Sequence, residues 1–317
     1  MNGSDGSRQA PARGVAVLRA LVRTMRPKQW IKNSFVFAAI AFSEARLWTQ
    51  PESIALACGA FIVFSLAASA IYLINDLADI EKDRAHPHKR HRPLASGELP
   101  GRVAGVAAVS LLTIALAGAA LLDSREGFDP GLLIVITIYL LVQGLLYTYW
   151  LKHLVILDVF TIAAGFVLRA IAGAVVLDIG ITPWLLICMG SLALFLGLGK
   201  RRAELVLLEG SAGSHRKILE EYSLPMLDQM LSLVTALTLM AYTLFTFSAT
   251  TLPREPYPVM LATVPFVVYA IFRYLYLIHH RGGGGSPEEL VLRDRPLALS
   301  ILAYGAVVLT VFALYPA

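Results

Sequence analysis

Long apolar runs separated by short polar stretches recur along the whole 317-residue chain. A membrane-spanning helix needs about 20 apolar residues to cross a hydrocarbon core of about 30 Å. Nine runs approach this length, and the first is the weakest because Glu44 and Arg46 interrupt its end. The predicted spans are residues 33–48, 53–75, 103–122, 131–150, 154–177, 183–199, 230–250, 257–279 and 297–316. The pattern therefore predicts an all-α polytopic membrane protein, a bundle of nine transmembrane helices.

The composition of the chain narrows the class of protein. Hydrophobic residues make up 57% of the chain, charged residues only 15%, and the mean hydropathy is +0.66. Soluble domains average about 45–50% apolar and about 25% charged residues, so a water-soluble globular protein is excluded. Residues 1–20 are polar and basic, and we expect them to form a disordered tail. Residues 21–317 are expected to form a single integral-membrane domain.

The basic residues indicate how the helices are oriented. With the N-terminus in the cytoplasm, 22 of the 27 Lys and Arg residues fall on the cytoplasmic side of the nine spans, and only three fall on the other side. Lys and Arg accumulate in the cytoplasmic loops of membrane proteins. We therefore expect a multi-pass protein of the cell (inner) membrane, with a cytoplasmic N-terminus, cytoplasmic active-site loops and an external C-terminus.

The acidic residues at the end of the second predicted span do not follow from this charge rule. If the helix continues beyond the apolar core, Asp76, Asp79 and Asp83 have i, i+3 and i+7 spacing, which places them on one helical face. Asn75 lies four residues before Asp79 on the same face. Hard oxygen donors of this kind suit Mg²⁺, which takes one or two carboxylates together with substrate phosphates. A solvated helix end, with acids that balance nearby bases, is the alternative interpretation.

Basic clusters on the same side of the membrane are candidate phosphate ligands, because Arg and Lys neutralise and hydrogen-bond phosphate oxygens. The loop after the acidic motif contains Arg84, Lys89, Arg90 and Arg92. Further candidates before the first span and after the fourth and sixth spans are Lys28, Lys32, Tyr147, Lys152, Lys200, Arg201 and Glu204. Any of these clusters could instead set the topology or attract anionic lipid headgroups.

Arg169 is a different case, because it lies deep within the fifth predicted span. A charged side chain is costly at that depth. Asp158 lies eleven residues earlier on the same helical face. We expect Arg169 to face a cavity or a buried partner, in either a structural or a functional role.

The motif Asn75-Asp76-x-x-Asp79-x-x-x-Asp83 resembles the first aspartate-rich motif of the UbiA superfamily of intramembrane prenyltransferases. The resemblance extends from Arg26 to the last span. It implies a UbiA-type bundle in which two aspartate-rich motifs bind a prenyl diphosphate through Mg²⁺, the second motif lying after the sixth span. Here that position holds Gly199-Lys200-Arg201-Arg202-Ala203-Glu204, which carries cations and no Asp-x-x-x-Asp.

Four further blocks, together with this replacement, are similar to one branch of the family, which transfers a phosphoribosyl group to a polyprenyl (decaprenyl) phosphate. The blocks are Arg26-Pro-x-Gln29-Trp30-x-Lys32-Asn33, Ser69-Ala-x-Tyr72-Leu-x-Asn75-Asp76, Lys89-Arg-x-Arg92-Pro and Leu292-Arg293-Asp294-Arg295. The resemblance implies Mg²⁺-dependent transfer of 5-phosphoribosyl from phosphoribosyl diphosphate, for the synthesis of arabinan precursors of the cell wall (arabinogalactan). The alternative is a prenyltransferase that moves a prenyl group from a diphosphate to an aromatic or other acceptor.

The resemblance and the charges together suggest roles for individual residues. Asn75, Asp76, Asp79 and Asp83 are the expected Mg²⁺ ligands, and the expected catalytic residues are Asn75, Asp76, Asp79 and Lys32. The expected substrate-binding residues are Lys28, Tyr72, Asp83, Arg84, Lys89, Arg90, Arg92, Tyr147, Lys152, Arg169, Lys200, Arg201 and Glu204. The expected partners are phosphoribosyl diphosphate, the polyprenyl phosphate and membrane lipid, without nucleic acid. The sequence leaves a homo-oligomer open.

Overall fold

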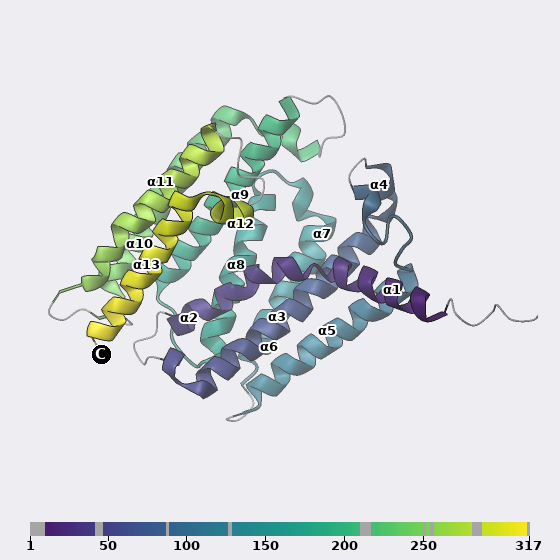
Figure 1. Ribbon diagram of the computed structural model, residues 1–317, viewed down its shortest axis with the longest axis horizontal. Coiled ribbons are helices and arrows are strands. Elements are labelled where there is room, and N and C mark those ends of the chain that lie inside the picture. The colour runs from purple at the N-terminus through teal and green to yellow at the C-terminus, as the bar shows by residue number, and fades with distance from the viewer. Residues whose placement is uncertain are drawn as a thin grey trace, which may run out of the picture.

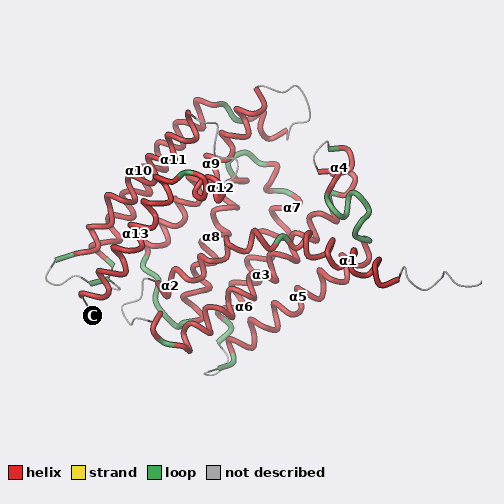
Figure 2. The backbone as a smooth tube through the Cα atoms, in the orientation of Figure 1, coloured by secondary structure: helices red, strands yellow, loops and turns green. Residues whose placement is uncertain are grey.

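The computed structural model describes residues 10–41, 47–86, 89–125, 129–209, 217–249, 252–253, 257–280 and 287–315. Within these residues every regular element is a helix, and the long helices pack side by side as a bundle (Figure 1). The connections between them are short relative to the helices (Figure 2). The all-α fold predicted from the apolar pattern is confirmed.

Eight helices within the described residues are long and apolar enough to cross a membrane. They are α3 (Pro51–Ala78), α5 (Gly101–Asp123), α6 (Gly131–Tyr139) with its continuation through η4 (Leu140–Leu146) and α7 (Tyr147–Tyr149), α8 (Leu157–Val176), α9 (Pro183–Glu209), α10 (Leu224–Ser248), η7 (Val259–Thr263) with α11 (Val264–His280), and α13 (Arg295–Leu314). They correspond to eight of the nine predicted spans. The chain is therefore a multi-pass membrane protein.

The first predicted span, residues 33–48, is not among these eight helices. It falls on the 3-10 helix η1 (Pro27–Phe37), the single turn α2 (Ala38–Ala41) and the short η2 (Leu47–Thr49). Residues 42–46, which include the two interrupting charges, lie outside the described residues. The tightly wound η1 replaces the regular α-helix that the apolar pattern suggests.

The segment formed by η1 and α2 runs antiparallel to α3 and is buried against α8. Trp30 Nε1 donates a hydrogen bond to Ser69 Oγ at 3.0 Å, and one turn further on Asn33 Nδ2 donates to Ser65 Oγ at 3.0 Å. On the other side, a Cβ atom at Gly173 of α8 would overlap the backbone carbonyl of η1. The close approach of η1 and α8 therefore requires a glycine at position 173.

An additional helix, α1 (Ala10–Met25), precedes η1. It starts within the stretch expected to be a disordered tail, whose residues 1–9 lie outside the described residues. Ala20 of α1 is buried against Leu73 of α3 and Ala104 of α5, and Val17 and Leu21 pack on the same cluster. Apolar residues at helical spacing explain why this basic segment folds, since their burial offsets the entropy of ordering the chain.

Most of the buried apolar core of the described residues falls into two parts of the bundle. One lies between α3, α5, α6 and α8 and contains small buried residues at several crossings, including Ala60, Ala67, Ala115 and Ala172. Small side chains let helix backbones approach closely in membranes. The other part lies between α9, α10, α11 and α13. The two parts meet where α8 of the first packs against α9 of the second (Figure 1).

Candidate active site

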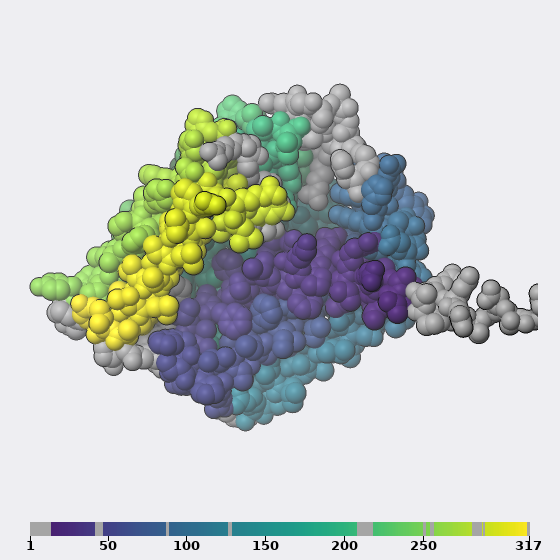
Figure 3. Space-filling model, viewed as in Figure 1, coloured from purple at the N-terminus to yellow at the C-terminus, as the bar shows by residue number. Residues whose placement is uncertain are grey.

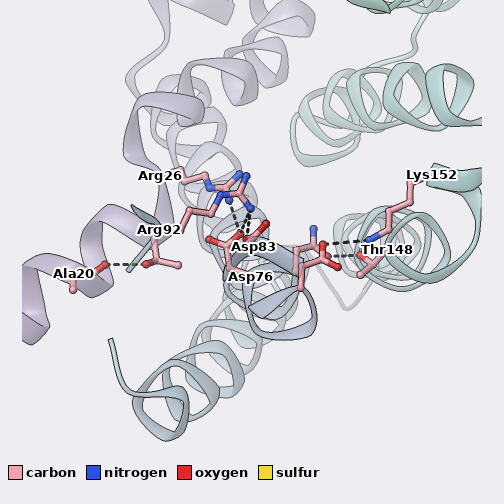
Figure 4. A network of polar contacts seen from close by, with 10 residues as sticks. Ala20, Arg26, Asp76, Asp83, Arg92, Thr148 and Lys152 are labelled. Atoms are coloured by element: carbon pink, nitrogen blue, oxygen red, sulfur yellow. Dashed lines mark hydrogen bonds and ion pairs between the residues drawn. The ribbon is translucent and has the colours of Figure 1, made fainter. Parts of the chain in front are cut away.

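The acidic motif lies where α3 ends. α3 continues to Ala78, Asp79 interrupts it with φ −103° and ψ 12°, and α4 (Ile80–Ala85) follows. Helical spacing nevertheless persists, because the backbone N–H groups of Asp79 and Asp83 each donate to the carbonyl four residues earlier. Asp76 and Asp83 then lie within about 20° of one another on the helix, offset from the other two oxygen donors. Asp76 and Asp83 lie beside Arg26 and Arg92, whereas the remaining donors face Thr148 and Lys152 (Figure 4).

Asp76 and Asp83 form a nearly buried cluster with two arginines. Arg26 Nη2 lies 2.6 Å from Asp76 Oδ1, and Arg92 Nη1 lies 3.2 Å from the same oxygen. Arg92 Nη1 also lies 2.8 Å from Asp83 Oδ2, so that it bridges the two carboxylates. Asp76 and Asp83 are only 3% and 4% exposed. Two guanidinium charges therefore balance two carboxylate charges in this cluster.

Arg26 was not among the residues expected to form the site. It stands at the junction of α1 and η1 with left-handed backbone angles (φ 54°, ψ 59°), and its guanidinium lies 4.7 Å from the centre of the Tyr72 ring. A left-handed conformation costs a non-glycine residue about 1–2 kcal/mol. The cation–π contact and the ion pair with Asp76 offset that strain. The available sequence signal was its position directly before Pro27, on the basic side of the membrane.

Asn75 and Asp79 contact a second element, the end of α7. Asn75 Oδ1 accepts a hydrogen bond from Thr148, and Lys152 Nζ lies 3.3 Å from Asp79 Oδ2. The π-helical segment η4 directly precedes α7, which carries Thr148. A π-helical turn changes the direction of the side chains that follow it and is frequent at functional sites. Here it brings α7 against the end of α3.

The end of α9 carries a different charge arrangement. Arg201 is 2% exposed, and its guanidinium pairs with Asp158 at 2.8 Å (Nε to Oδ2) and with Glu204. Tyr147 is close enough to act on Arg201 electrostatically. Arg201 and Glu204 are thus brought together as expected, but within a buried network. Asp158 belongs to this network and was not an expected site residue.

Tyr222, just after η6 (Lys217–Glu221), completes the network from a third segment. Its hydroxyl donates to Asp158 Oδ1 at 2.8 Å and accepts from the backbone N–H of Ile156 at 2.7 Å. Ile156 has φ 72°, which is strained for a β-branched residue. Burial, followed by the hydrogen bond to Asp158, raises the pKa of Tyr222 above its ordinary value. The tyrosine therefore remains a donor at neutral pH and links the start of α8 to α9.

Arg169 does not join either charge cluster. Its guanidinium donates to Asn33 Oδ1 at 2.7 Å, to Tyr139 Oη at 2.9 Å and to the Gly165 carbonyl at 2.5 Å. The buried partner expected from the sequence exists, but Asp158 is not that partner. Arg169 joins α8 to η1 and α6 within the apolar core, at the level of Ser65. Ser65 lies eleven residues before Asp76 on α3, about 16 Å along the helix.

The remaining expected site residues differ in exposure and contacts. Lys28, Arg90 and Lys200 are exposed, whereas Lys32, Tyr72, Lys89 and Tyr147 are half-buried. Arg84 turns away from the acidic cluster, because its Nε donates to the Ala95 carbonyl and its Nη1 pairs with Glu81. An anion in solvent can therefore reach the side chains of the exposed Lys28, Arg90 and Lys200.

The oxygen donors of the acidic cluster are of the type that magnesium prefers. Within the part of the chain that the structure describes, three or more His, Cys, Asp or Glu side chains do not converge on one point. Arg92 nevertheless places one cationic group within 3.2 Å of both Asp76 and Asp83. A site of one or two carboxylates, completed by water and phosphate oxygens, is the usual protein environment of magnesium. Asp76 and Asp83 fit that environment.

The fold and this site define a class of protein, a helical membrane protein with a charged site at the ends of its helices. Residues 34–287 match the UbiA prenyltransferase family, and the chain belongs to that family. Decaprenyl-phosphate phosphoribosyltransferase of Mycobacterium tuberculosis is 38% identical over 303 residues, which cover 95% of each chain. The protein of that name from Mycolicibacterium smegmatis is 38% identical over 301 residues, 91% of each chain.

A solved structure supports the fold independently. A UbiA homolog from Archaeoglobus fulgidus, bound to GPP and Mg²⁺, matches 93% of this chain and 99% of its own with a TM-score of 0.66. Its sequence is 17% identical, so that the likeness concerns the fold.

Proposed function

We propose that the protein transfers a 5-phosphoribosyl group from phosphoribosyl diphosphate to a polyprenyl phosphate, decaprenyl phosphate in the first instance. The products are polyprenylphosphoryl-5-phosphoribose and diphosphate, and the lipid serves the synthesis of cell-wall arabinan. The identity to two decaprenyl-phosphate phosphoribosyltransferases over nearly the whole chain supports this reaction. So does the charge of the site.

The observation that carries the proposal is the difference between the two charge clusters. The end of α3 with α4 has two nearly buried carboxylates, and the end of α9 has Arg201 with the exposed Lys200 beside it. Phosphoribosyl diphosphate carries a 5-phosphate in addition to its diphosphate, and the acceptor carries a further phosphate. Both clusters are balanced by their own ion pairs, but further cations, among them the exposed Lys28, Arg90 and Lys200, suit these three anionic groups better than a second acidic motif would.

The acidic cluster is the proposed place of the diphosphate leaving group. Magnesium bound at Asp76, with Asp83, Asp79 and Asn75 as further donors, would supply Lewis-acid stabilisation of the departing diphosphate. Arg26 and Arg92, which pair with Asp76 here, would then be available to bind phosphate oxygens. Lys152 lies within 3.3 Å of Asp79 and is positioned to bind the same group.

The second cluster is the proposed place of the remaining phosphates. Lys200 is exposed and serves as a direct ligand, whereas Arg201 is held by Asp158 and Glu204 and positions its neighbours. The C1–O bond of the ribose breaks as a lipid phosphate oxygen attacks the opposite face of C1. The attacking oxygen is already anionic, so the site needs to hold the two substrates in line rather than to remove a proton.

The proposal includes a ninth membrane crossing, formed by η1 and α2, and the orientation of the bundle in the membrane. η1 has eleven residues at about 2.0 Å rise, and α2 has four at about 1.5 Å, which gives about 28 Å. This approaches the hydrocarbon thickness of about 30 Å. The segment therefore crosses the inner membrane as the first of nine spans, with the N-terminus and both charge clusters in the cytoplasm. The catalytic domain expected to begin at residue 21 then also includes the earlier part of α1, because Val17 and Ala20 pack on the bundle.

The test uses purified protein in vesicles with Mg²⁺, decaprenyl phosphate and radiolabelled phosphoribosyl diphosphate. We expect label in an organic-extractable lipid, and a decrease of at least about 100-fold for Asp79→Asn, because removal of a charged ligand from a phosphoryl site costs several kcal/mol. Glu81→Gln is the matched control, since Glu81 is an exposed acid of the next turn that pairs with Arg84. This variant should retain its activity.

Two results would contradict the proposal. Labelled lipid that forms equally in Asp79→Asn would remove the acidic motif from the reaction. Turnover of geranyl diphosphate with an aromatic acceptor, without transfer of labelled ribose, would identify the protein as a prenyltransferase and show that the cations at the end of α9 serve another purpose.

A further inference from the structure

Helix α1 carries an apolar stripe that the bundle does not cover. Val15, Leu18 and Val22 follow i, i+3 and i+7 spacing and are 60%, 60% and 45% exposed. The face that packs against α3 and α5 contains Ala20 and Thr24, which are 3% and 1% exposed. At 100° per residue, the stripe points away from Ala20 and Thr24, and it adjoins the partly buried Leu21 at one edge of the packed face. In Figure 3, α1 lies on the outside of the bundle, along the blue surface of α3 and α5.

The depth of α1 in the bundle follows from its contacts with α5. Ala20 packs in one cluster with Ala104 and Ala108 of α5, a helix that begins at Gly101. These positions lie about 5 Å and about 10 Å below the start of the span. An interfacial helix buries its apolar face about 5–10 Å into the boundary between headgroups and acyl chains. The depth of α1 matches that boundary.

The charges of α1 lie on a separate face. Arg19 is exposed, and Arg23 is half-exposed and pairs with Glu98 at 2.5 Å. On the helical wheel, both arginines lie on one flank of the apolar stripe, between Val15 and the packed Ala20. A helix with one apolar stripe and one basic face is attracted to a bilayer that contains anionic lipid.

We propose that α1 is an interfacial helix that inserts Val15, Leu18 and Val22 into the leaflet on the side of the acidic cluster, with Arg19 at the level of anionic headgroups. The occupant of the exposed stripe is thus the lipid surface itself. A second copy of this chain would also cover an apolar stripe. The basic face beside the stripe and its depth along α5 favour lipid.

This placement has a consequence for the site, which rests on the proposed function. α1 leads without a loop into Arg26, and the Met25 carbonyl accepts a hydrogen bond from Ser69 Oγ at 3.2 Å. Arg26 then pairs with Asp76. Insertion of α1 into the leaflet would hold the left-handed turn at Arg26 in place. The bilayer would therefore help to position a guanidinium of the active site.

Spin labelling tests the placement without any assumption about the reaction. A nitroxide is attached at Leu18→Cys or, as the matched neighbour, at Arg19→Cys, in a Cys58→Ala background; the other cysteine, Cys188, is buried. The protein is placed in vesicles of phosphatidylcholine and phosphatidylglycerol. We expect the label at position 18 to collide several-fold more often with oxygen than with a water-soluble nickel chelate. The label at position 19 should show the reverse.

Two outcomes would overturn the placement. Equal access of the nickel chelate to both labels would mean that α1 lies in water. Protection of position 18 from both reagents, with dipolar broadening between labels, would mean that a second copy covers the stripe.

A kinetic measurement tests the link to Arg26. Leu18→Asp is expected to raise the KM for phosphoribosyl diphosphate about tenfold, with little change in kcat, while Leu18→Ile retains the parent values. Thermal unfolding of both variants shows whether they remain folded. An unchanged KM in a Leu18→Asp protein whose α1 has left the membrane would refute the link. Failure of the parent protein to transfer phosphoribose would refute the proposed function and leave the spin-label result intact.

Discussion

Arg26, Arg92, Asp76 and Asp83 form a group whose charges cancel. Asp76 Oδ1 contacts both guanidiniums, and Arg92 also contacts Asp83. A divalent cation at these carboxylates would compete with the arginines, and the displaced arginines would carry two unbalanced positive charges. A diphosphate group neutralises such charges. The same residues would thus suit the protein both without and with the metal–diphosphate complex proposed above.

Arg26→Gln tests this exchange at the scale of a single residue. Without substrate, the variant is expected to bind Mn²⁺ about tenfold more tightly than the parent, because one competing cation is gone. It should bind phosphoribosyl diphosphate about tenfold more weakly, since a charge-assisted hydrogen bond contributes about 1.5–3 kcal/mol. Electron paramagnetic resonance of free Mn²⁺ and equilibrium dialysis measure the two affinities. Changes of the same sign would refute the exchange, and Arg102→Gln, an exposed arginine of α5, serves as the control.

Arg169 is expected to act on stability and not on catalysis. Arg169→Met leaves Asn33 and Tyr139 without their guanidinium donor inside the bundle. A buried polar group that loses its partner costs about 1–3 kcal/mol. We expect the midpoint of thermal unfolding to fall by about 5 °C, with an unchanged KM for phosphoribosyl diphosphate. A raised KM in a variant of normal stability would instead place Arg169 in the substrate site.

At the scale of elements, three segments converge on Asp158. The start of α8 carries Asp158 and the strained Ile156, α9 carries Arg201, and the segment after η6 carries Tyr222. The two hydrogen bonds of the Tyr222 hydroxyl hold the strained turn and the carboxylate together. The network therefore keeps this part of α9, with its exposed Lys200, in a defined position relative to the start of α8.

Tyr222→Phe is expected to lower kcat/KM about tenfold, because the hydroxyl no longer holds Asp158 and the Ile156 backbone. Tyr242→Phe is the matched control, since that variant also loses one buried hydroxyl. The Tyr242 hydroxyl contacts Thr263 between α10 and η7, away from the Asp158 network. Steady-state kinetics and thermal unfolding of both variants separate the two effects. Equal losses of kcat/KM in both variants would reduce Tyr222 to a packing residue.

The raised pKa of Tyr222 also determines the pH range in which its hydrogen bonds stabilise the folded protein. An ordinary tyrosine ionises at about pH 10, and the folded protein holds the proton more tightly. The hydrogen bonds of the Tyr222 hydroxyl contribute their full stability below about pH 10. This contribution decreases as the pH rises further, because Tyr222 of the unfolded chain then loses its phenolic proton while the folded protein retains it. The effect of Tyr222→Phe on unfolding should therefore be constant from about pH 6 to about pH 9 and shrink above about pH 10. A decline already at neutral pH would contradict the assignment.

At the scale of the whole molecule, the charge clusters lie on the two parts of the bundle. The acidic cluster stands at the end of α3, in the part with α5, α6 and α8, and the Arg201 network stands at the end of α9, in contact with α10 and α11. α7 reaches both clusters, through Thr148 and through Tyr147. A small relative movement of the two parts would change the distance between the proposed sites for the two substrates.

The proposed topology predicts the location of both termini. With nine spans, the N-terminus is cytoplasmic and the C-terminus external, whereas eight spans would place both on one side. Fluorescence of an N-terminal green fluorescent protein, together with activity of alkaline phosphatase fused after residue 317, is the expected result. A phosphatase fused after Gly97 is the control and should be inactive. An inactive phosphatase at the C-terminus would show that η1 and α2 do not cross.

The amino-acid sequence by itself determined the helical membrane fold, because eight apolar runs are each long enough to span a bilayer whatever their neighbours are. It also located the acidic motif and the family, since these depend on residue types at fixed spacing. Periodicity assumes a regular helix, however. It could not predict the 3-10 geometry of η1, or that the expected oxygen donors divide into two groups with different partners.

Only the tertiary structure decided the partners of the charged residues. Arg26 lies 50 residues from Asp76, and Arg169 lies 136 residues from Asn33. Tyr222 lies 64 residues from Asp158. Contacts at such separations depend on how helices cross, and spacing along one helix carries no information about them. Because a charge buried in a membrane bundle must find a partner at whatever position the packing allows, the role of each charged residue follows from the fold and not from its motif.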